Sequence, residues 1–242
     1  MSWFKEIVGI EESQVQETCL VIPYLMPEFL KGFGLKELKR GKLFSAANVE
    51  SLTVIRAGIG APLVGDAVLH LRETQVKRII FFGSCGLLPG VPNIGIGNLV
   101  CPTECLAYES FTEVLHERTE QISSTRPDPI FLQKCFDEFS AQVHSVKGMT
   151  FGSLFLEKQF VDFFREQKVQ VIDMEVSAFF AASKKIQRPA IALMVVTDIV
   201  GQETPFSDTT PSEKRVIAAA IVSASKIIKS LSKDRRLAAQ VR

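Results

Sequence analysis

The sequence carries little net charge and lacks long uninterrupted hydrophobic runs. The formal net charge of its 242 residues is +1, so no broad positive field exists to attract nucleic acid or an acidic membrane surface. The longest apolar runs are broken by proline or charged residues well before the roughly 18–20 residues that a membrane span needs. Neither nucleic acid nor a membrane is therefore expected as a partner.

Paired cysteines and a secretory signal are also missing. The five cysteines are an odd number, and none forms a CxxC pair or stands at metal-ligand spacing beside the three histidines. The N-terminal stretch MSWFKEIVGIEES lacks the basic-then-apolar pattern of a secretory signal. We expect reduced thiols, a cytoplasmic protein and no metal site.

From residue 19 onward, strand-like and helix-like segments alternate. Apolar, β-branched runs predict strands, several of them buried on both faces, and segments with a 3.6-residue period predict amphipathic helices. This alternation predicts one α/β domain over residues 1–242 with a largely parallel sheet. The predicted strands cover residues 19–24, 52–58, 78–84, 98–102, 169–173 and 190–198, and the predicted helices cover 62–75, 129–142, 157–168 and 175–187.

The last helix has the clearest start. Thr210 offers an N-cap, Pro211 occupies the first helical position, and Glu213 completes a capping box. By contrast, residues 103–128 are polar and show little periodicity, so we expect a long loop there.

Two glycine-containing segments follow predicted strands, at the places where ligands gather in α/β sheets. The segment GIGAPLVG (58–65) is not a dinucleotide fingerprint, because its last glycine is misplaced, no acid ends the following strand, and the Walker lysine is absent. In GSCG (83–86), Gly83 and Ser84 are candidate substrate-binding residues, since they offer amide N–H groups and a hydroxyl to an anion or a sugar hydroxyl. A plain structural turn is the alternative for both segments.

Two carboxylates stand where apolar strands end. Glu175 enters a predicted helix, where an acid serves either as a favourable charge at the helix start or as the acceptor that grips a vicinal diol. Asp198 ends the most apolar strand of the chain, and a carboxylate in such surroundings can hold or donate a proton near neutral pH.

In this order, the segments resemble the nucleoside phosphorylase/nucleosidase superfamily, which includes purine nucleoside and uridine phosphorylases and methylthioadenosine/S-adenosylhomocysteine nucleosidase. The resemblance covers roughly residues 19–232 and rests on GIGAP, GSCG, GNLV (97–100), VIDMExxA (171–178) and VVTD (195–198). It implies a three-layer α/β/α sandwich around a mixed, largely parallel sheet. It also implies that no cofactor is needed and that the chain forms a homo-oligomer, whose size the sequence leaves open.

The resemblance also implies roles for single residues. Glu175 would accept hydrogen bonds from the ribose 2′- and 3′-hydroxyls, kept ionised by the helix start, and Met174 would form an apolar floor beneath the sugar. Asp198, with Thr197 beside it in the substrate site, would protonate or hydrogen-bond the base as it leaves. Phe155 matches the aromatic that stacks on the base in the family, and a core phenylalanine is the alternative.

The group that accepts the sugar is left open. Phosphorylases of the family carry an arginine where this chain has Phe81, and an apolar side chain cannot neutralise phosphate. Nucleosidases place a glutamate in the first loop to orient water, and Glu28 stands at the matching position. Alternatively, Glu28 only opens a surface helix after Pro27. The nucleosidase pattern is also incomplete, because Met194 replaces an arginine, and Arg56 or a partner subunit could instead hold phosphate.

The leading hypothesis is an enzyme that cleaves the N-glycosidic bond of a purine-type nucleoside, with water somewhat favoured over phosphate. The second is a phosphorylase with an altered anion site and inorganic phosphate as co-substrate. The third is a non-catalytic nucleoside-binding protein on the same scaffold. An unrelated dinucleotide-binding protein is the fourth, and the glycine pattern argues against it. The sequence does not fix the base or the 5′-substituent.

Overall fold

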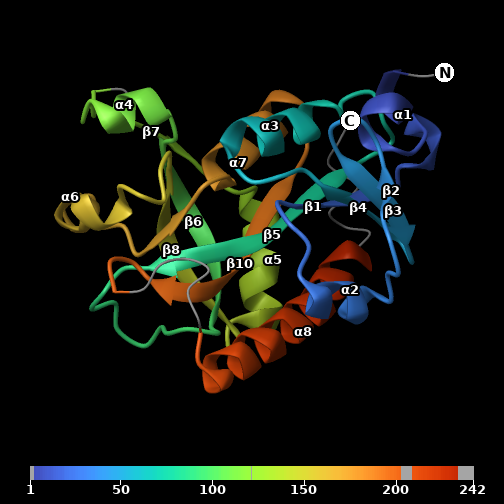
Figure 1. The fold of residues 1–242 in the computed structure, drawn as a ribbon. Coiled ribbons are helices and arrows are strands. Elements are labelled where there is room, and N and C mark those ends of the chain that lie inside the picture. The colour runs from blue at the N-terminus through green and yellow to red at the C-terminus, as the bar shows by residue number, and fades with distance from the viewer. Residues whose placement is uncertain (1–2, 121, 203–208, 234–242) are drawn as a thin grey trace.

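The computed structural model describes residues 3–120, 122–202 and 209–233, and the strands within them join into one ten-stranded sheet flanked by helices (Figure 1). The strands are β1 (Thr18–Ile22), β2 (Lys39–Arg40), β3 (Ser45–Val49), β4 (Leu52–Arg56), β5 (Arg78–Leu87), β6 (Leu99–Tyr108), β7 (Ser123–Thr125), β8 (Val143–Phe151), β9 (Val171–Asp173) and β10 (Ala190–Ile199). The α-helices are α1 (Trp3–Val8), α2 (Pro27–Phe33), α3 (Ala61–Leu69), α4 (Phe111–Leu115), α5 (Pro129–Phe139), α6 (Val161–Glu166), α7 (Val176–Lys185) and α8 (Pro211–Lys233). Two short 3₁₀ helices are η1 (Glu12–Gln14) and η2 (Glu157–Gln159).

The sheet is partly closed on itself. Its strands follow the order β10-β6-β8-β9-β5-β1-β4-β3-β2, with β7 paired to β6. Because β10 also pairs with β5 in parallel, the strands β5, β9, β8, β6 and β10 form a ring. β1 lies parallel to both β5 and β4 and leads from the ring into the open part of the sheet. The expected mixed α/β sheet is confirmed, and its closure was not predicted.

Helices cover both faces of the sheet. Helices α3 and α7 lie on one face, and α2, α5 and α8 lie on the other (Figure 1). Successive side chains of β5 point to opposite faces, as a strand requires. Phe81 packs on Phe179 of α7 with ring centroids 5.5 Å apart, and Phe82 stacks on Phe29 of α2 at 5.1 Å. The expected three-layer α/β/α sandwich is therefore confirmed.

Several boundaries differ from the prediction. The expected long loop at 103–128 is wrong, because β6 continues to Tyr108 and α4 and β7 follow it. The polar composition of this stretch hid the strand, whose order comes from its pairing with β8 along its length. The helix expected over 157–168 is divided into η2 and α6.

The start of the last helix agrees with the prediction. Thr210 N donates to Glu213 Oε2 at 2.7 Å, and Glu213 N donates to Thr210 Oγ1 at 3.3 Å. These reciprocal hydrogen bonds are the two halves of a capping box, and α8 follows directly at Pro211.

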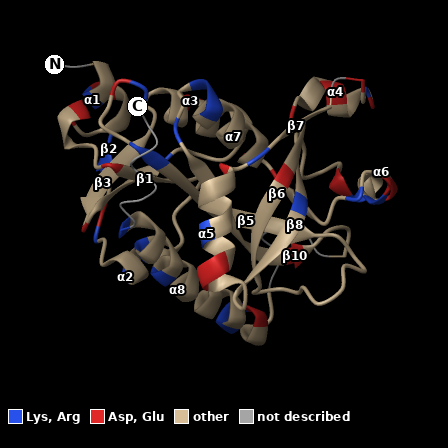
Figure 2. Cartoon of the chain, turned by 180° about the vertical axis from the view of Figure 1, so that it is seen from behind, with Lys and Arg blue, Asp and Glu red and all other residues tan. Residues whose placement is uncertain are grey.

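In the part of the chain that the structure describes, charged residues do not gather by sign. In Figure 2, basic and acidic segments are interspersed over the outer helices and the margins of the sheet, while the central strands are largely uncharged. Among the described residues, no helix combines the length and the apolar character that crossing a membrane would require.

Candidate functional site

The start of α7 is organised by Asp173, the last residue of β9. Its Oδ1 accepts hydrogen bonds from Glu175 N and Val176 N, both at 2.7 Å, and from Thr150 Oγ1 at 2.9 Å. Thr150 Oγ1 in turn accepts from Ser177 N at 2.8 Å. Asp173 and Thr150 therefore satisfy the free N–H groups at the start of this helix. Capping was the alternative role that the sequence allowed for an acid in the segment 173–175, and Asp173 performs it.

Glu175 is held by the glycine turn at the end of β4. Its Oε1 accepts a hydrogen bond of 2.7 Å from Gly60 N, which ties α7 to the GIGAP segment 115 positions earlier in the chain. Gly60 has φ of +109°, a conformation that side chains rarely adopt, so glycine is required there. The glycine turn predicted from the sequence thus has an identified partner, the carboxylate of Glu175.

Burial determines the protonation of Glu175. Only 4% of this residue is exposed, and desolvation, followed by the nearby charge of Asp173, raises the pKa of Glu175 to about 8. The expectation that the helix start keeps this carboxylate ionised is wrong, because Asp173 and Thr150 already occupy the N–H groups of the helix. Without a ligand, Glu175 holds a proton at neutral pH.

Asp198 lies at an irregularity in β10. The pairing of β10 with β5 shifts register between Val196 and Asp198, and such bulges redirect side chains near functional sites. Thr197 Oγ1 donates to Asp198 Oδ1 at 2.9 Å. Gly86 of β5 leaves the room that Asp198 uses, since a Cβ atom at Gly86 would lie 3.0 Å from Asp198 Oδ2. Asp198 is 6% exposed.

Tyr24, which follows β1, contacts the part of β5 that lies between the two acids. Its hydroxyl donates to Ser84 Oγ at 2.8 Å. Burial raises the pKa of Tyr24, and the charges of Glu175, Asp198 and Cys85 raise it further. Ser84 also pairs with Val195 of β10. Two residues further along β5, Gly86 pairs with Ile172 of β9 and lies against the Asp198 carboxylate. The loop after β1, the end of β9 and the end of β10 therefore meet along β5. The structure therefore brings together the two acids that the sequence singled out, and adds Tyr24.

The GSCG segment is not the loop that the sequence suggested. β5 continues through it to Leu87, and Gly83, Ser84 and Cys85 pair with β10. Gly83 lies over the ring of Phe81, whose nearest carbon would be 2.8 Å from an added Cβ. The segment lies beside Asp198 as a strand, and the Ser84 hydroxyl accepts from Tyr24. Binding of substrate by Gly83 and Ser84 stays a prediction.

The segment after β8 contributes an exposed aromatic and a buried acid. Phe155 is 77% exposed, which excludes the alternative of a core phenylalanine. Two residues later, Glu157 is only 6% exposed, and desolvation, followed by the charges of Asp198 and Asp173, raises its pKa to about 8. Sequence reasoning missed Glu157, because an acid in an amphipathic stretch is normally solvated. Met174, beside Glu175, is half-buried.

Four positions bear on whether water or phosphate accepts the sugar, and their surroundings differ. Glu28 lies half-buried in the first turn of α2, as the structural alternative expected. Within the described part of the chain, it makes no hydrogen bond or ion pair, and its role stays a prediction. Phe81 and Met194 are both fully buried in the same apolar cluster. Arg56 donates to Ser45 Oγ at 3.2 Å on the neighbouring strand.

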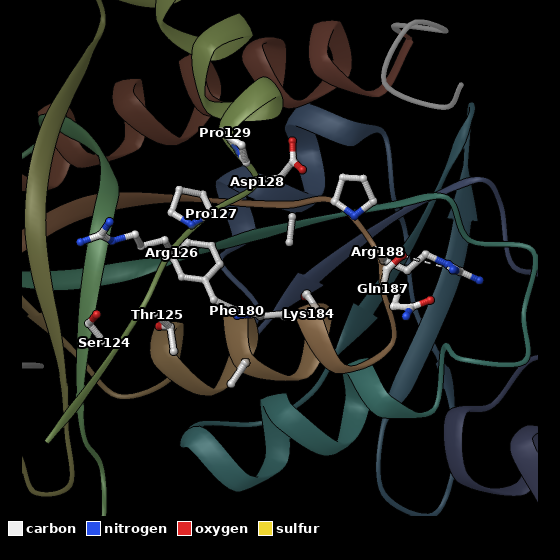
Figure 3. Close-up of a pocket in the computed structure, with 14 residues that line it drawn as sticks. Ser124, Thr125, Arg126, Pro127, Asp128, Pro129, Phe180, Lys184, Gln187 and Arg188 are labelled. Atoms are coloured by element: carbon white, nitrogen blue, oxygen red, sulfur yellow. Dashed lines mark hydrogen bonds between the residues drawn. The ribbon is translucent and has the colours of Figure 1, made fainter. Parts of the chain in front are cut away.

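A separate groove of about 790 Å³ lies at the other end of α7 (Figure 3). It is lined by residues 124–129, by the last turns of α7 and by residues 187–190, and none of these is a predicted site residue. Arg126 donates to Glu104, and Arg188 donates to the carbonyl oxygen of Val76. Both guanidinium groups are thus already engaged, and the converging acids remain the better candidate site.

Comparisons with known proteins identify the family of the chain. The family model described as the phosphorylase superfamily matches residues 13–233. The DeoD-type purine nucleoside phosphorylase of Brevibacillus brevis is 21% identical over 229 residues, which cover 88% of this chain and 96% of that protein.

Solved structures show the same fold at low sequence identity. The uridine phosphorylase of Vibrio fischeri has a TM-score of 0.74 and 16% identity, covering 94% of this chain and 95% of that chain. The 5′-methylthioadenosine/S-adenosylhomocysteine nucleosidase of Helicobacter pylori has a TM-score of 0.70 and 15% identity, and the match covers 90% of this chain and 97% of that chain. Because the matching family model spans nearly all of the described sheet and both converging acids, the chain belongs to the phosphorylase superfamily.

Proposed function

We propose that this protein cleaves the N-glycosidic bond of a purine-type nucleoside, with water favoured over phosphate as the acceptor of the sugar. The observation that carries the proposal is the position of the two acids beside one residue of β5. Gly86 pairs with Ile172, three residues before Glu175, and lies against the carboxylate of Asp198. The protein belongs to the phosphorylase superfamily, and a purine nucleoside phosphorylase is among its relatives. Both findings support this chemistry.

The proposal divides the work between the two acids. Glu175 accepts hydrogen bonds from the ribose hydroxyls, with Met174 beneath the sugar, and Asp198 protonates or hydrogen-bonds the base as it leaves. Cleavage builds positive charge on the sugar and negative charge on the base, so groups placed at these two ends lower the barrier. The exposed ring of Phe155 is available to stack on the base.

The preference for water rests on the residue at the position where phosphorylases of the family carry an arginine. Phe81 stands there, and its side chain is fully buried beneath α7. An apolar, buried side chain cannot neutralise a phosphate dianion, whereas water needs no such charge. In this scheme Glu28 orients the attacking water.

The test is to incubate the purified protein with adenosine, inosine, methylthioadenosine and uridine, each with and without phosphate, and to measure free base. The expected result is purine release without phosphate, lost in the Asp198→Asn variant. A strict phosphate requirement with formation of ribose 1-phosphate would overturn the preference for water. That outcome would establish phosphorolysis, the second candidate, which the names of the curated relatives favour.

If no nucleoside releases its base, the proposed activity is wrong. Calorimetry then distinguishes the remaining possibility on this scaffold. Tight nucleoside binding without turnover would identify a non-catalytic nucleoside-binding protein.

A further inference from the structure

Glu157 occupies an unusual place beside the converging acids. It is the first residue of η2 and lies two residues after the exposed Phe155. The 3₁₀ helix rests against the turn that follows β10, because a Cβ atom at Gly201 would lie 3.8 Å from Lys158 Cβ. Glu157 is thereby placed near Asp198, at the end of the site that the proposed function assigns to the base.

The carboxyl group of Glu157 has no hydrogen-bond or ion-pair partner among the described residues. Glu157 is 6% exposed. Among the described residues, the side-chain polar atoms that are fully enclosed and lack a hydrogen-bond partner are His70 Nε2 and Ser183 Oγ, and the Glu157 oxygens do not belong to this group. The carboxyl oxygens therefore keep contact with solvent at an otherwise buried position. A carboxyl group held in this way is costly unless something else supplies its hydrogen bonds.

Burial and neighbouring charges control the proton of Glu157. Burial, followed by the charges of Asp198 of β10 and Asp173 of β9, raises its pKa to about 8. The cation of its neighbour Lys158 lies over the Phe155 ring, 5.9 Å from the centroid. Below about pH 8 the group is a neutral acid that offers one donor and one acceptor, and above it the group only accepts.

We propose that Glu157 contacts the 6-substituent of the purine and so sets which base is accepted. The inference rests on the proposed function, because it places the base next to Asp198. An exocyclic 6-amine donates to Glu157 in either of its protonation states. A 6-oxo group only accepts, so it finds a donor only while Glu157 is protonated. An ionised Glu157 therefore selects 6-aminopurine nucleosides and rejects 6-oxopurine nucleosides.

The experiment compares kcat/KM for adenosine and inosine between pH 6 and 9.5. In the wild-type protein, the ratio of adenosine to inosine is expected to rise above pH 8 by up to about tenfold per pH unit. The Glu157→Gln variant keeps one donor and one acceptor at every pH, so its ratio is expected to stay constant. Glu157→Leu removes the contact and is expected to lower both values and flatten the ratio.

Glu166→Gln is the matched control, because Glu166 is an exposed acid on the adjoining α6. Its pH profile is expected to follow the wild type. A wild-type ratio that does not change with pH, or an unchanged profile in Glu157→Gln, would overturn the inference. The proposed function fails separately, through absence of base release from every nucleoside. If Glu157→Leu does not fold, the nearly isosteric Glu157→Gln variant still tests the inference.

Discussion

At Glu175, burial and ligand binding act in opposite directions on one proton. Burial raises the pKa of the empty site to about 8. In the proposed site, a ribose diol would add two donors to the one from Gly60 N, and these hydrogen bonds would favour the ionised form. Binding of a nucleoside would therefore be coupled to release of this proton.

This coupling gives a pH dependence of affinity. As pH rises towards the pKa of Glu175, nucleoside affinity is expected to increase by up to about tenfold per pH unit, and it should level off near pH 8. Calorimetry in buffers of different ionisation enthalpy should detect close to one proton released at pH 6.5. Glu175→Gln, which cannot ionise, is expected to bind at least about tenfold more weakly and to lose the pH dependence. Undiminished affinity in that variant would contradict the diol-binding role.

Asp198 differs from Glu175 because its proposed contact strengthens as the base leaves. Asp198→Asn is expected to reduce kcat by about 10²–10⁴-fold, as for the loss of a general acid. Nucleoside Kd should change much less, since the ground state depends little on this proton. Stopped-flow turnover and equilibrium binding on the same preparation separate the two effects. Equal losses in both would assign Asp198 to binding.

At the scale of single elements, the bulge in β10 and the glycines of β5 position Asp198. A Cβ atom at Gly86 would lie 2.9 Å from Val200 Cγ2 and 3.0 Å from Asp198 Oδ2, so Gly86→Ala displaces the carboxylate or the turn after it. We expect a loss of turnover of about 10²-fold, in line with small misplacements of reacting groups. Thermal melting should show a folded protein.

Gly65→Ala is the matched control for that substitution. Gly65 lies inside α3, and its added Cβ would be in ordinary contact, 3.8 Å from Ala178 Cβ. The variant is expected to gain about 0.5–1 kcal/mol of stability with unchanged turnover, because alanine favours helix. Similar activity in the two variants would show that close packing at Gly86 does not position Asp198.

The sequence predicted the elements whose signal is local. The period of α7, the apolar run of β10 and the capping box at Thr210 each depend on neighbouring residues, and each was found. The prediction failed where distant segments decide the outcome. β6 was hidden by its polar residues, because its order comes from pairing with β8. Glu157 was overlooked because its burial depends on tertiary packing that the local sequence does not show.

For the whole molecule, the buried acids link stability to pH. The folded state raises the pKa values of Glu157 and Glu175 from 4.5 to about 8, so between these values the folded protein binds protons that the unfolded chain has released. The free energy of unfolding must then fall as pH rises through this window. We expect a lower melting temperature at pH 8.5 than at pH 5.5.

The Glu157→Gln variant tests that origin, since its amide cannot ionise. Its melting temperature should fall less steeply over the same range than that of the wild type. Glu166→Gln, at an exposed position, should leave the slope as it is. A wild-type melting temperature that rises with pH, or equal slopes in all three proteins, would place the pH dependence elsewhere.

The most direct measurement is a crystal structure of the protein with a bound, non-hydrolysable adenosine analogue. The expected density lies between Glu175 and Asp198, with the 2′- and 3′-hydroxyls within hydrogen-bond distance of the Glu175 carboxylate and N7 of the base facing Asp198. A nucleoside bound in the groove at the far end of α7, or bound with its sugar away from Glu175, would contradict the convergence of these two acids on one substrate.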